Sequence, residues 1–291
     1  MSKVKNPLSH LDLSGKLVAV TGTSGGLGYE ICRYLAMAGA TILQMDRNPE
    51  RQEKTARKIK AEFPNAILKP YTLDLASMES VKHACDFLSQ DVPDILIHNA
   101  GAYAVPRYTT DAGLDNVYQI NYAAPYYMTR TLAPLMKEKG TRVIVVGSIA
   151  HNYSHIDISD PMFLTRDRSS LVYGNAKRHL TYAMQALGES EGLHISLTHP
   201  GITPTNITAH YPKWLYAIIR HPMRWIFMPP RKAALSILEG VDTPTPTGKW
   251  IGPRIFGIWG LPRFYSLPKI GECERLEILR NADALYDMLS H

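Results

Sequence analysis

The sequence predicts an α/β fold, a single domain built on a doubly wound parallel sheet of about seven strands. Short apolar runs rich in valine and isoleucine alternate with longer segments of helical periodicity, and a glycine-rich turn follows the first apolar run. Such runs suit parallel strands covered on both faces, and their alternation with helices is typical of doubly wound sheets. With 291 residues, 45% of them hydrophobic, the chain can bury a core of that size.

The expected elements alternate regularly up to about residue 200. The expected strands are 16–21, 40–45, 66–73, 94–99, 142–147 and 194–199, and the expected helices are 26–38, 50–62, 77–89, 112–138 and 172–191. Beyond residue 200 the sequence is rich in Pro, Trp and Tyr, before a last helix near 273–288. We expect one domain over 1–291, comprising an N-terminal arm (1–14), a substrate lid (200–230) and a C-terminal extension (252–291).

Charge and cysteine content exclude several classes of protein. The net charge is +6, but the basic residues are scattered, and the run 51–60 alternates with acids as a solvated helix face does. We therefore expect no nucleic-acid partner. Cys32, Cys85 and Cys273 lie too far apart for a disulfide framework, and no histidine or cysteine spacing indicates a metal site. Because we find neither a secretory signal nor an apolar run of the ~20 residues that span a bilayer, we expect a cytoplasmic protein.

The stretch 17-LVAVTGTSGGLGYEIC-32 concentrates its glycines between an expected strand and an expected helix. Glycine permits close backbone approach, and a helix N-terminus offers unpaired N–H groups to an anion. Asp46 follows the second strand, 18 residues after Gly28, close to the ~20-residue spacing of a carboxylate that bonds ribose hydroxyls. We predict a dinucleotide site rather than an ordinary strand-to-helix turn. Its turn residues are Gly22, Ser24, Gly25, Gly26, Leu27 and Gly28.

The spacing of this turn, T-G-x-x-x-G-x-G, resembles that of the short-chain dehydrogenase/reductase family, whose members have a Rossmann fold. Further segments are similar to the family's motifs and occur in its order: 72-TLDLAS-77, 98-HNAG-101 (with His98 in place of Asn), 119-QINYAAP-125, 146-VGSIA-150, 173-YGNAK-177 and 199-HPGITPT-205. The resemblance covers residues 14–208 strongly and the remainder weakly. A lone Y-x-x-x-K is common, so the weight of the resemblance comes from the order of the whole set.

The resemblance implies an NAD(P)-dependent oxidoreductase acting on CH–OH groups, with Asn121, Ser148, Tyr173 and Lys177 as its catalytic residues. Tyr173 would be the general base for alcohol oxidation and the general acid for ketone reduction, and Ser148 would hold the substrate oxygen. A free tyrosine titrates near pH ~10, and we expect the positive charges of Lys177 and the oxidised nicotinamide to lower the Tyr173 pKa toward neutrality. The other implied cofactor contacts are Asp74, Leu75, Asn99, Ala100, Gly101, Tyr173, Lys177, Pro200, Gly201, Ile202 and Thr205.

Pro125 lies four residues after Asn121 in the expected helix 112–138. Proline lacks the N–H that would bond the carbonyl of residue i−4, so the Asn121 carbonyl loses its helical partner and the helix should kink there. In the family, that freed carbonyl holds a water that links the lysine to solvent. The alternative is that Asn121 is a surface amide.

The choice of dinucleotide depends on the end of the second strand. Asp46 should accept bonds from a free 2′-OH and repel a 2′-phosphate, which favours NAD over NADP. The turn 23–25 also lacks the Lys or Arg that many NADP users of the family carry there. Arg47, next to the acid, keeps NADP open as the alternative.

Two segments indicate a bulky apolar substrate. The long stretch between Ser148 and Tyr173 looks like the one in retinol-dehydrogenase-like members, which act on retinoids and steroids. Residues 211–230 are rich in aromatic side chains and methionine, with basic neighbours. We predict a hydroxysteroid dehydrogenase for a steroid or bile acid. The alternatives are a retinol dehydrogenase-reductase, a general carbonyl reductase, and a dinucleotide-sensing regulator without activity.

The sequence also bears on contacts with a membrane and with other copies of the chain. The aromatic segment 211–230 is also compatible with a lid packed for stability or with a membrane-surface helix, although its prolines limit a continuous helix. Relatives commonly pair through the helices expected at 112–138 and 172–191, so we expect a homo-oligomer.

Overall fold

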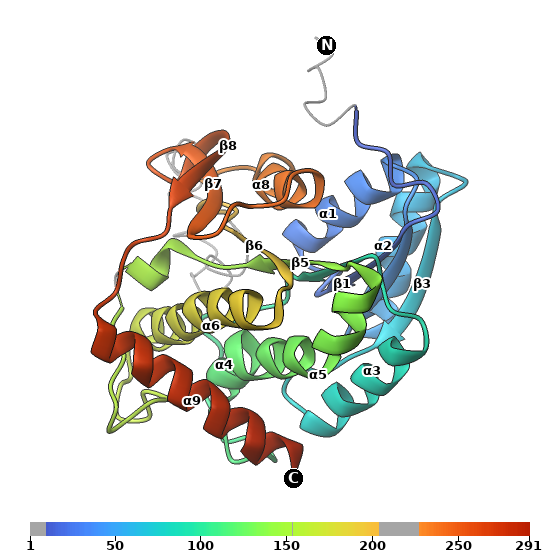
Figure 1. Cartoon of the computed structure of the whole chain (residues 1–291). Helices are drawn as coiled ribbons and strands as arrows, with labels where there is room; N and C mark the ends of the chain where they lie inside the picture. Colours follow the sequence, from blue (N-terminus) through green and yellow to red (C-terminus); the bar gives the residue numbers. More distant parts are fainter. Residues whose placement is uncertain (1–9, 153, 204–226) are drawn as a thin grey trace, which may run out of the picture.

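An eight-stranded sheet forms the centre of the computed structural model, which describes residues 10–152, 154–203 and 227–291 (Figure 1). The strand order is β3-β2-β1-β4-β5-β6-β7-β8. Strands β1 to β7 are parallel, which confirms the expected doubly wound sheet, and β8 is added antiparallel to β7 at one edge. The strands are β1 (Leu17–Thr21), β2 (Thr41–Asp46), β3 (Ile67–Thr72), β4 (Ile95–His98), β5 (Arg142–Val146), β6 (His194–Thr198), β7 (Lys249–Ile255) and β8 (Trp259–Ser266).

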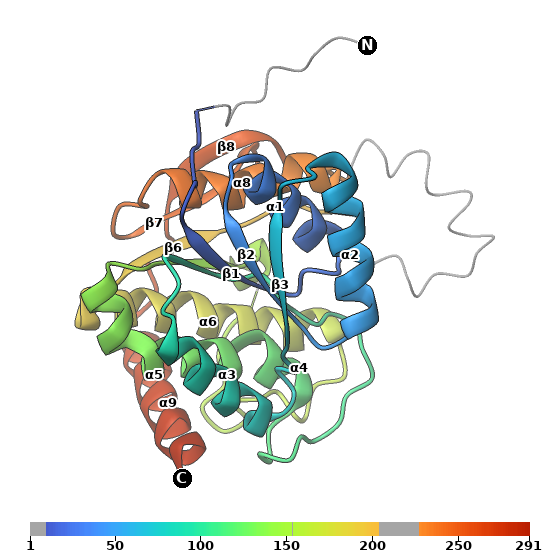
Figure 2. The same cartoon turned by 90° about the vertical axis from the view of Figure 1, so that its right-hand side faces the viewer.

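Helices cover both faces of the sheet (Figures 1 and 2). One face carries α1 (Gly26–Met37), α2 (Pro49–Glu62) and α8 (Pro230–Asp242), and the other carries α3 (Met78–Gln90), α4 (Asn116–Tyr118), α5 (Ala124–Lys139) and α6 (Ser169–Glu191). The last helix, α9 (Glu272–Ser290), lies across α5 and α6. No helix in the described part of the chain is both long enough and apolar enough to cross a membrane.

The apolar runs of the central strands β1, β2, β4 and β5 are buried on both faces, as their composition predicts, whereas β3 at the edge of the sheet is mostly exposed. In β5, Val143 and Val145 belong to the core that α5 and α6 cover, whereas Ile144 and Val146 belong to the core under α1 and α8. This alternation follows from the period of two along a strand. The sheet is therefore fixed between two helical layers, and its carboxyl edge is left for loops.

The expected helix 112–138 is interrupted. A π-helical turn, η1 (Gln119–Ala123), separates α4 from α5 and contains Asn121. Because Pro125 has no N–H, the α-helical ladder cannot continue through the Asn121 carbonyl, and the wider turn replaces it. The expected disruption of the helix at Asn121 takes the form of a π-helical turn that ends just before α5.

Strands β7 and β8 and helix α8 were not expected from the sequence. Pro253 lies within β7 and pairs with Pro262 of β8, and proline normally argues against a strand. Here both prolines belong to a hairpin at the sheet edge, where a missing backbone donor is tolerated. Residues 252–266 of the expected C-terminal extension therefore contribute to the main sheet, whereas the expected last helix is confirmed as α9.

Candidate active site

The predicted site residues follow the carboxyl ends of parallel strands. Gly22 follows β1, Asn99 follows β4, Ser148 follows β5 and Pro200 follows β6. Because these four strands are consecutive neighbours in the sheet, the residues after them share one edge. The π-helical turn η1 brings Asn121 to the same edge, and helix α6 brings Tyr173 and Lys177.

The glycine turn is shaped by close backbone contacts. Gly22 has a φ of +71°, and a Cβ there would lie 2.8 Å from the Cα of Ala100. A Cβ on Gly28 would lie 2.1 Å from the Gly22 carbonyl oxygen, so neither position accepts a side chain. Gly25 and Gly26 are exposed, and α1 begins at Gly26 without a side-chain cap. These uncapped N–H groups at an exposed glycine surface fit a pyrophosphate.

The segment after β4 braces this turn. The Asn99 side-chain amide donates to the carbonyls of Thr21 at 2.9 Å and Gly22 at 3.0 Å. The Thr21 hydroxyl accepts from the backbone N–H groups of Asn99 and Ala100, both at 3.0 Å. Asn99 and Ala100 therefore shape the turn as well as adjoining the predicted cofactor site. Gly101 is exposed, and a Cβ on it would lie 2.8 Å from the Asn121 side-chain oxygen.

Asp46 is 7% exposed at the end of β2, and its carboxylate bonds the glycine turn. It accepts from the Ser24 backbone N–H at 2.8 Å and from the Ser24 hydroxyl at 2.7 Å. Arg47, the next residue, is exposed. The carboxylate that we predict to select the dinucleotide thus also holds the turn that we predict to bind its pyrophosphate.

Asp74 and Leu75 have local partners after β3. The Asp74 carboxylate accepts from the Ala76 N–H at 2.9 Å, and the Leu75 carbonyl accepts from the side chain of Gln119 at 3.0 Å. Gln119 begins the π-helical turn that holds Asn121. The segment 74–76 is therefore hydrogen-bonded to the turn that carries Asn121.

Asn121 and Lys177 are both buried, directly beneath the exposed Gly101. The fully buried Asn121 amide donates to the carbonyls of Ala102 at 2.8 Å and Val117 at 2.9 Å. Lys177 is 3% exposed, and its ammonium nitrogen donates to the Val146 carbonyl at 2.9 Å. That nitrogen lies 5.8 Å from the centre of the Tyr173 ring. The structure therefore brings all these predicted catalytic groups together.

Ser148 hydrogen-bonds Tyr173, but burial decides how these groups titrate. Burial raises the pKa of Tyr173 to about 12, although the hydrogen bond with Ser148 acts to lower it. Burial also lowers the pKa of Lys177 to about 7. We expected the positive charges of Lys177 and the oxidised nicotinamide to lower the Tyr173 pKa; in the protein chain by itself, desolvation dominates the pKa of both Tyr173 and Lys177.

Two aromatic side chains at the site, Tyr103 and His151, were not predicted from the sequence as functional residues. The Tyr103 ring lies edge-on to the Tyr173 ring, with centroids 5.1 Å apart. The buried His151 ring donates from Nδ1 to the Ser148 carbonyl, and Arg178 donates to the His151 carbonyl at 2.6 Å. The position of Tyr103 directly after the 98–101 motif could have indicated it.

The long segment between Ser148 and Tyr173 is folded against the site. The Asp160 carboxylate accepts from the backbone N–H groups of Leu164 at 2.7 Å and Thr165 at 2.9 Å. The guanidinium of Arg107 donates to the Phe163 carbonyl at 3.2 Å, and the fully buried Phe163 belongs to a small apolar cluster against which Tyr173 packs. This segment thus forms one wall beside the predicted general base.

The segment after β6 forms another side of the site. Gly201 has a φ of +83°, and a Cβ on it would lie 2.6 Å from the Ile258 carbonyl oxygen. Pro200 is buried, and the Ile202 carbonyl accepts from the Met228 N–H at 2.7 Å. The predicted contact Thr205 and residues 204–226 of the predicted lid lie outside the described residues.

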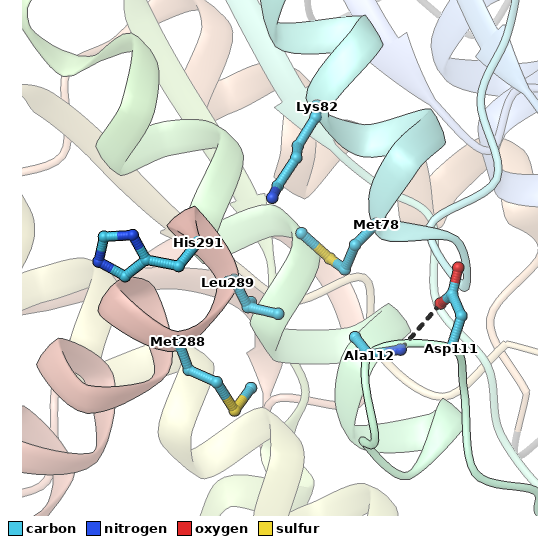
Figure 3. A pocket seen from close by; sticks show the side chains of 7 residues that line it. All are labelled: Met78, Lys82, Asp111, Ala112, Met288, Leu289 and His291. Atoms are coloured by element: carbon cyan, nitrogen blue, oxygen red, sulfur yellow. Dashed lines mark hydrogen bonds between the residues drawn. The ribbon is translucent and has the colours of Figure 1, made fainter.

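A separate pocket contains none of the predicted site residues. It lies between α3, the turn at 111–112 and the end of α9 (Figure 3). The residues that line it are Met78, Lys82, Asp111, Ala112, Met288, Leu289 and His291. In the described part of the chain, no group of three or more His, Cys, Asp or Glu side chains is arranged to hold a metal ion.

Known proteins share both this sequence pattern and this fold. The chain is 31% identical over 223 residues to the WW domain-containing oxidoreductase of Homo sapiens, covering 74% of this chain and 53% of that protein. It is 30% identical over 209 residues to retinol dehydrogenase 13 of Homo sapiens, covering 69% of this chain and 63% of that protein. It therefore spans only about half to two-thirds of the length of these relatives. A crystal structure of a putative uncharacterized protein from Mycobacterium paratuberculosis superposes with a TM-score of 0.72 at 25% identity, covering 96% of this chain and 94% of that one.

The family assignment rests on sequence and geometry together. Residues 16–215 match the short chain dehydrogenase family, whose fold binds NAD or NADP. The matched range contains the glycine turn and the four predicted catalytic residues, and the structure places them at one edge of the sheet. The chain therefore belongs to the short-chain dehydrogenase family.

Proposed function

We propose that the chain is an NAD-dependent dehydrogenase for the hydroxyl group of a bulky apolar lipid alcohol. One observation carries the proposal: Ser148, Tyr173 and Lys177 lie together at the carboxyl edge of the sheet, beside a glycine turn in which Gly22 and Gly28 leave no room for a side chain. Reversible alcohol oxidation requires hydroxyls that hold the substrate oxygen and transfer its proton, a lysine that supports them, and a turn that binds the dinucleotide.

When bound, NAD would supply the hydride acceptor. The hydroxyls of Ser148 and Tyr173 would both contact the substrate oxygen, which fixes its orientation. Tyr173 would take the hydroxyl proton during oxidation and return it during reduction. Lys177 would contact the ribose of the cofactor. Because burial lowers its pKa to about 7, it would also take part in proton transfer to and from Tyr173 near neutral pH. Asn121 would hold the water that connects Lys177 to solvent.

The preference for NAD is proposed from Asp46. Its carboxylate is held at the end of β2 by two hydrogen bonds from Ser24, so it cannot easily turn away from a 2′-substituent of the adenosine ribose. A free 2′-OH would donate to it, whereas a 2′-phosphate would meet a like charge. The exposed Arg47 is the group that would favour NADP instead.

A lipid alcohol is proposed from the segment 149–172 and from the relatives. This segment builds an apolar wall around Phe163 next to Tyr173, and retinol dehydrogenase 13 is among the similar proteins. The sequence of the predicted lid adds aromatic residues and methionine. A steroid or bile acid remains our first substrate class, with retinol as the alternative.

The proposal is tested by the absorbance of reduced nicotinamide. The purified chain is mixed with NAD or NADP and with a panel of bile acids, neutral steroids and retinol. We expect turnover of an apolar alcohol with NAD, and its loss in Tyr173→Phe. Binding of the dinucleotide without turnover of any member of the panel would contradict the proposed substrate class.

We also propose that any homo-oligomer uses a surface other than the outer faces of α5 and α6. Helix α9 lies across these helices, and its Asp283 and Glu274 form ion pairs with Arg130 and Arg178. The surface through which we expected copies to pair is thus covered by the chain's own last helix.

A further inference from the structure

The turn that joins β7 to β8 displays an apolar tip. The Phe256 side chain is 91% exposed, and Ile255 and Leu261 beside it are 54% and 60% exposed. No large hydrophobic side chain in the described residues is more exposed than Phe256. Single exposed apolar residues are common on protein surfaces, but a cluster of three large ones indicates contact with something outside the chain.

The backbone of this turn makes Phe256 still more unusual. The Ile258 N–H donates to the Ile255 carbonyl at 2.9 Å, and the two residues between them have positive φ, +50° for Phe256 and +69° for Gly257. This is the pattern of a type I′ turn, for which Asn, Asp and Gly are the favoured residues. A bulky residue is strained there. Neither packing nor backbone preference therefore accounts for phenylalanine at this position.

The charge around the tip is positive. Residues 243–271 contain four basic residues and no aspartate or glutamate. Arg254 and Arg263 are exposed on the two strands next to the turn. The ammonium nitrogen of Lys232 lies 5.6 Å from the centre of the Trp259 ring, where β8 begins. The tip thus consists of an apolar centre with a cationic rim.

The hairpin of β7 and β8, at the upper left of Figure 1, packs against residues that adjoin the candidate active site. The Tyr265 hydroxyl donates to the Pro253 carbonyl at 2.7 Å, and the Trp250 and Tyr265 rings stack with centroids 4.9 Å apart. A Cβ on Gly257 would lie 3.4 Å from the side chain of Ile149, the residue after Ser148. The turn also packs on Gly201 through the Ile258 carbonyl. One side of the tip therefore touches the site while Phe256 projects into solvent.

We propose that this tip docks on the surface of an anionic lipid bilayer. Phe256, Ile255 and Leu261 enter the interfacial region, and the arginines contact the lipid headgroups. A protein partner fits less well, because a stable protein interface takes about 800 Å² from each partner, far more than three side chains supply. The inference rests on the proposed function in one respect: an apolar alcohol dissolved in the bilayer would then enter the site from the surface on which the protein sits.

Sedimentation with vesicles tests this proposal without substrate or cofactor. The full chain is mixed with vesicles of phosphatidylcholine alone, and with vesicles that also contain phosphatidylserine. We expect binding to the vesicles with phosphatidylserine, and at least tenfold weaker binding for Phe256→Asn. Asparagine suits a type I′ turn, so this variant keeps the fold, which thermal unfolding verifies.

Two further variants separate the tip from general surface effects. Ile67 is 54% exposed at the start of β3, at the opposite end of the strands, so Ile67→Asn should bind vesicles as the wild type does. Replacement of Arg254 and Arg263 by Gln should weaken binding about fivefold each, and salt should weaken the binding of the wild type.

Three results would overturn the proposal: no wild-type binding to phosphatidylserine vesicles at low salt, wild-type affinity in Phe256→Asn, or a dimer that Phe256→Asn abolishes without any vesicle binding. In the last case the tip pairs two copies of the chain. Because vesicle binding is measured without turnover, its failure leaves the proposed dehydrogenase activity intact. Failure of turnover with normal vesicle binding would reject only the proposed function.

Discussion

Two turns at the carboxyl edge of the sheet place residues in the left-handed backbone region, and they do so for opposite reasons. At Gly22, with a φ of +71°, the backbone of Ala100 leaves no room for a side chain. At Phe256, with a φ of +50°, the side chain has open space and is 91% exposed. The first turn presents backbone N–H groups to a ligand, whereas the second presents a side chain to its surroundings. The same region of backbone space thus accompanies two different proposed roles, a backbone cradle for the cofactor and an exposed side chain for docking.

The largest expected effect is at the glycine turn, on both stability and cofactor binding. In Gly28→Ala, the new Cβ would lie 2.1 Å from the Gly22 carbonyl oxygen and 2.9 Å from the Thr23 Cα, both backbone atoms. We expect the free energy of unfolding to fall by about 3 kcal/mol and NADH binding to be lost. Urea unfolding and NADH fluorescence measure the two effects. Gly25→Ala is the matched control, because its Cβ would be 3.8 Å from the nearest atom, and its stability should match the wild type. Equal unfolding midpoints for the two variants would contradict the steric argument.

Tyr173→Phe tests the chemistry between the two turns. Loss of the proton-transferring hydroxyl should lower kcat by about 10²- to 10⁴-fold, while NADH binding is retained because the ring remains. The rate of NADH formation with an active alcohol measures it. Tyr103→Phe is the control, since it keeps the edge-on ring contact with Tyr173, and should retain kcat within about threefold. A Tyr173→Phe enzyme with wild-type kcat would remove Tyr173 as the base.

Asp46→Ser tests whether the carboxylate at the end of β2 selects NAD over NADP. Removal of the carboxylate should raise the ratio of kcat/KM for NADP to that for NAD by about 10- to 100-fold, because the like charge facing a 2′-phosphate is gone. Steady-state kinetics with each dinucleotide give the ratio. Arg47→Gln should leave NAD kinetics unchanged. A ratio unaffected by Asp46→Ser would show that Asp46 serves only its two hydrogen bonds with Ser24.

The lowered pKa of Lys177 makes stability depend on pH. Lys177 has a pKa of about 7 in the folded chain and about 10.4 when unfolded, so between these values the unfolded state binds one proton more. Stability should therefore rise with pH in this window, by up to about 1.4 kcal/mol per unit, and the cost of burying the charge is greatest below pH 7. Lys177→Met should lack this rise. Parallel stability profiles of the two proteins from urea unfolding at pH 7 to 10 would contradict the buried-lysine argument.

The smallest expected effect is on the second turn. Phe256→Asn removes a strained residue and no buried contact, so the free energy of unfolding should stay equal or rise by up to about 1 kcal/mol. Thermal unfolding measures the change. A fall of more than about 1 kcal/mol would mean that Phe256 is part of the packing of the fold.

The sequence predicted the first two-thirds of the chain well because its signals are local. The valine- and isoleucine-rich runs and the glycine turn are contiguous, and Pro125 acts on a carbonyl four residues away. The hairpin of β7 and β8 escaped prediction because Pro253 and Pro262 argue against strands unless the strands lie at an edge. The hydrogen bond from His151 to the Ser148 carbonyl could not be predicted, because it depends on a short helical turn, Ile149–Asn152, that no hydrophobic periodicity indicates.

By itself, the sequence determined the order of strands and helices up to about residue 200, the family, and which residue types follow each of those strands. Those follow from hydrophobic period, turn chemistry and motif spacing, which are properties of neighbouring residues. Only the tertiary structure decided the pKa directions of Tyr173 and Lys177, the bond from Ser24 to Asp46, and the covering of α5 and α6 by α9. Burial and long-range contact set these, because desolvation depends on everything packed around a group rather than on its neighbours in the chain.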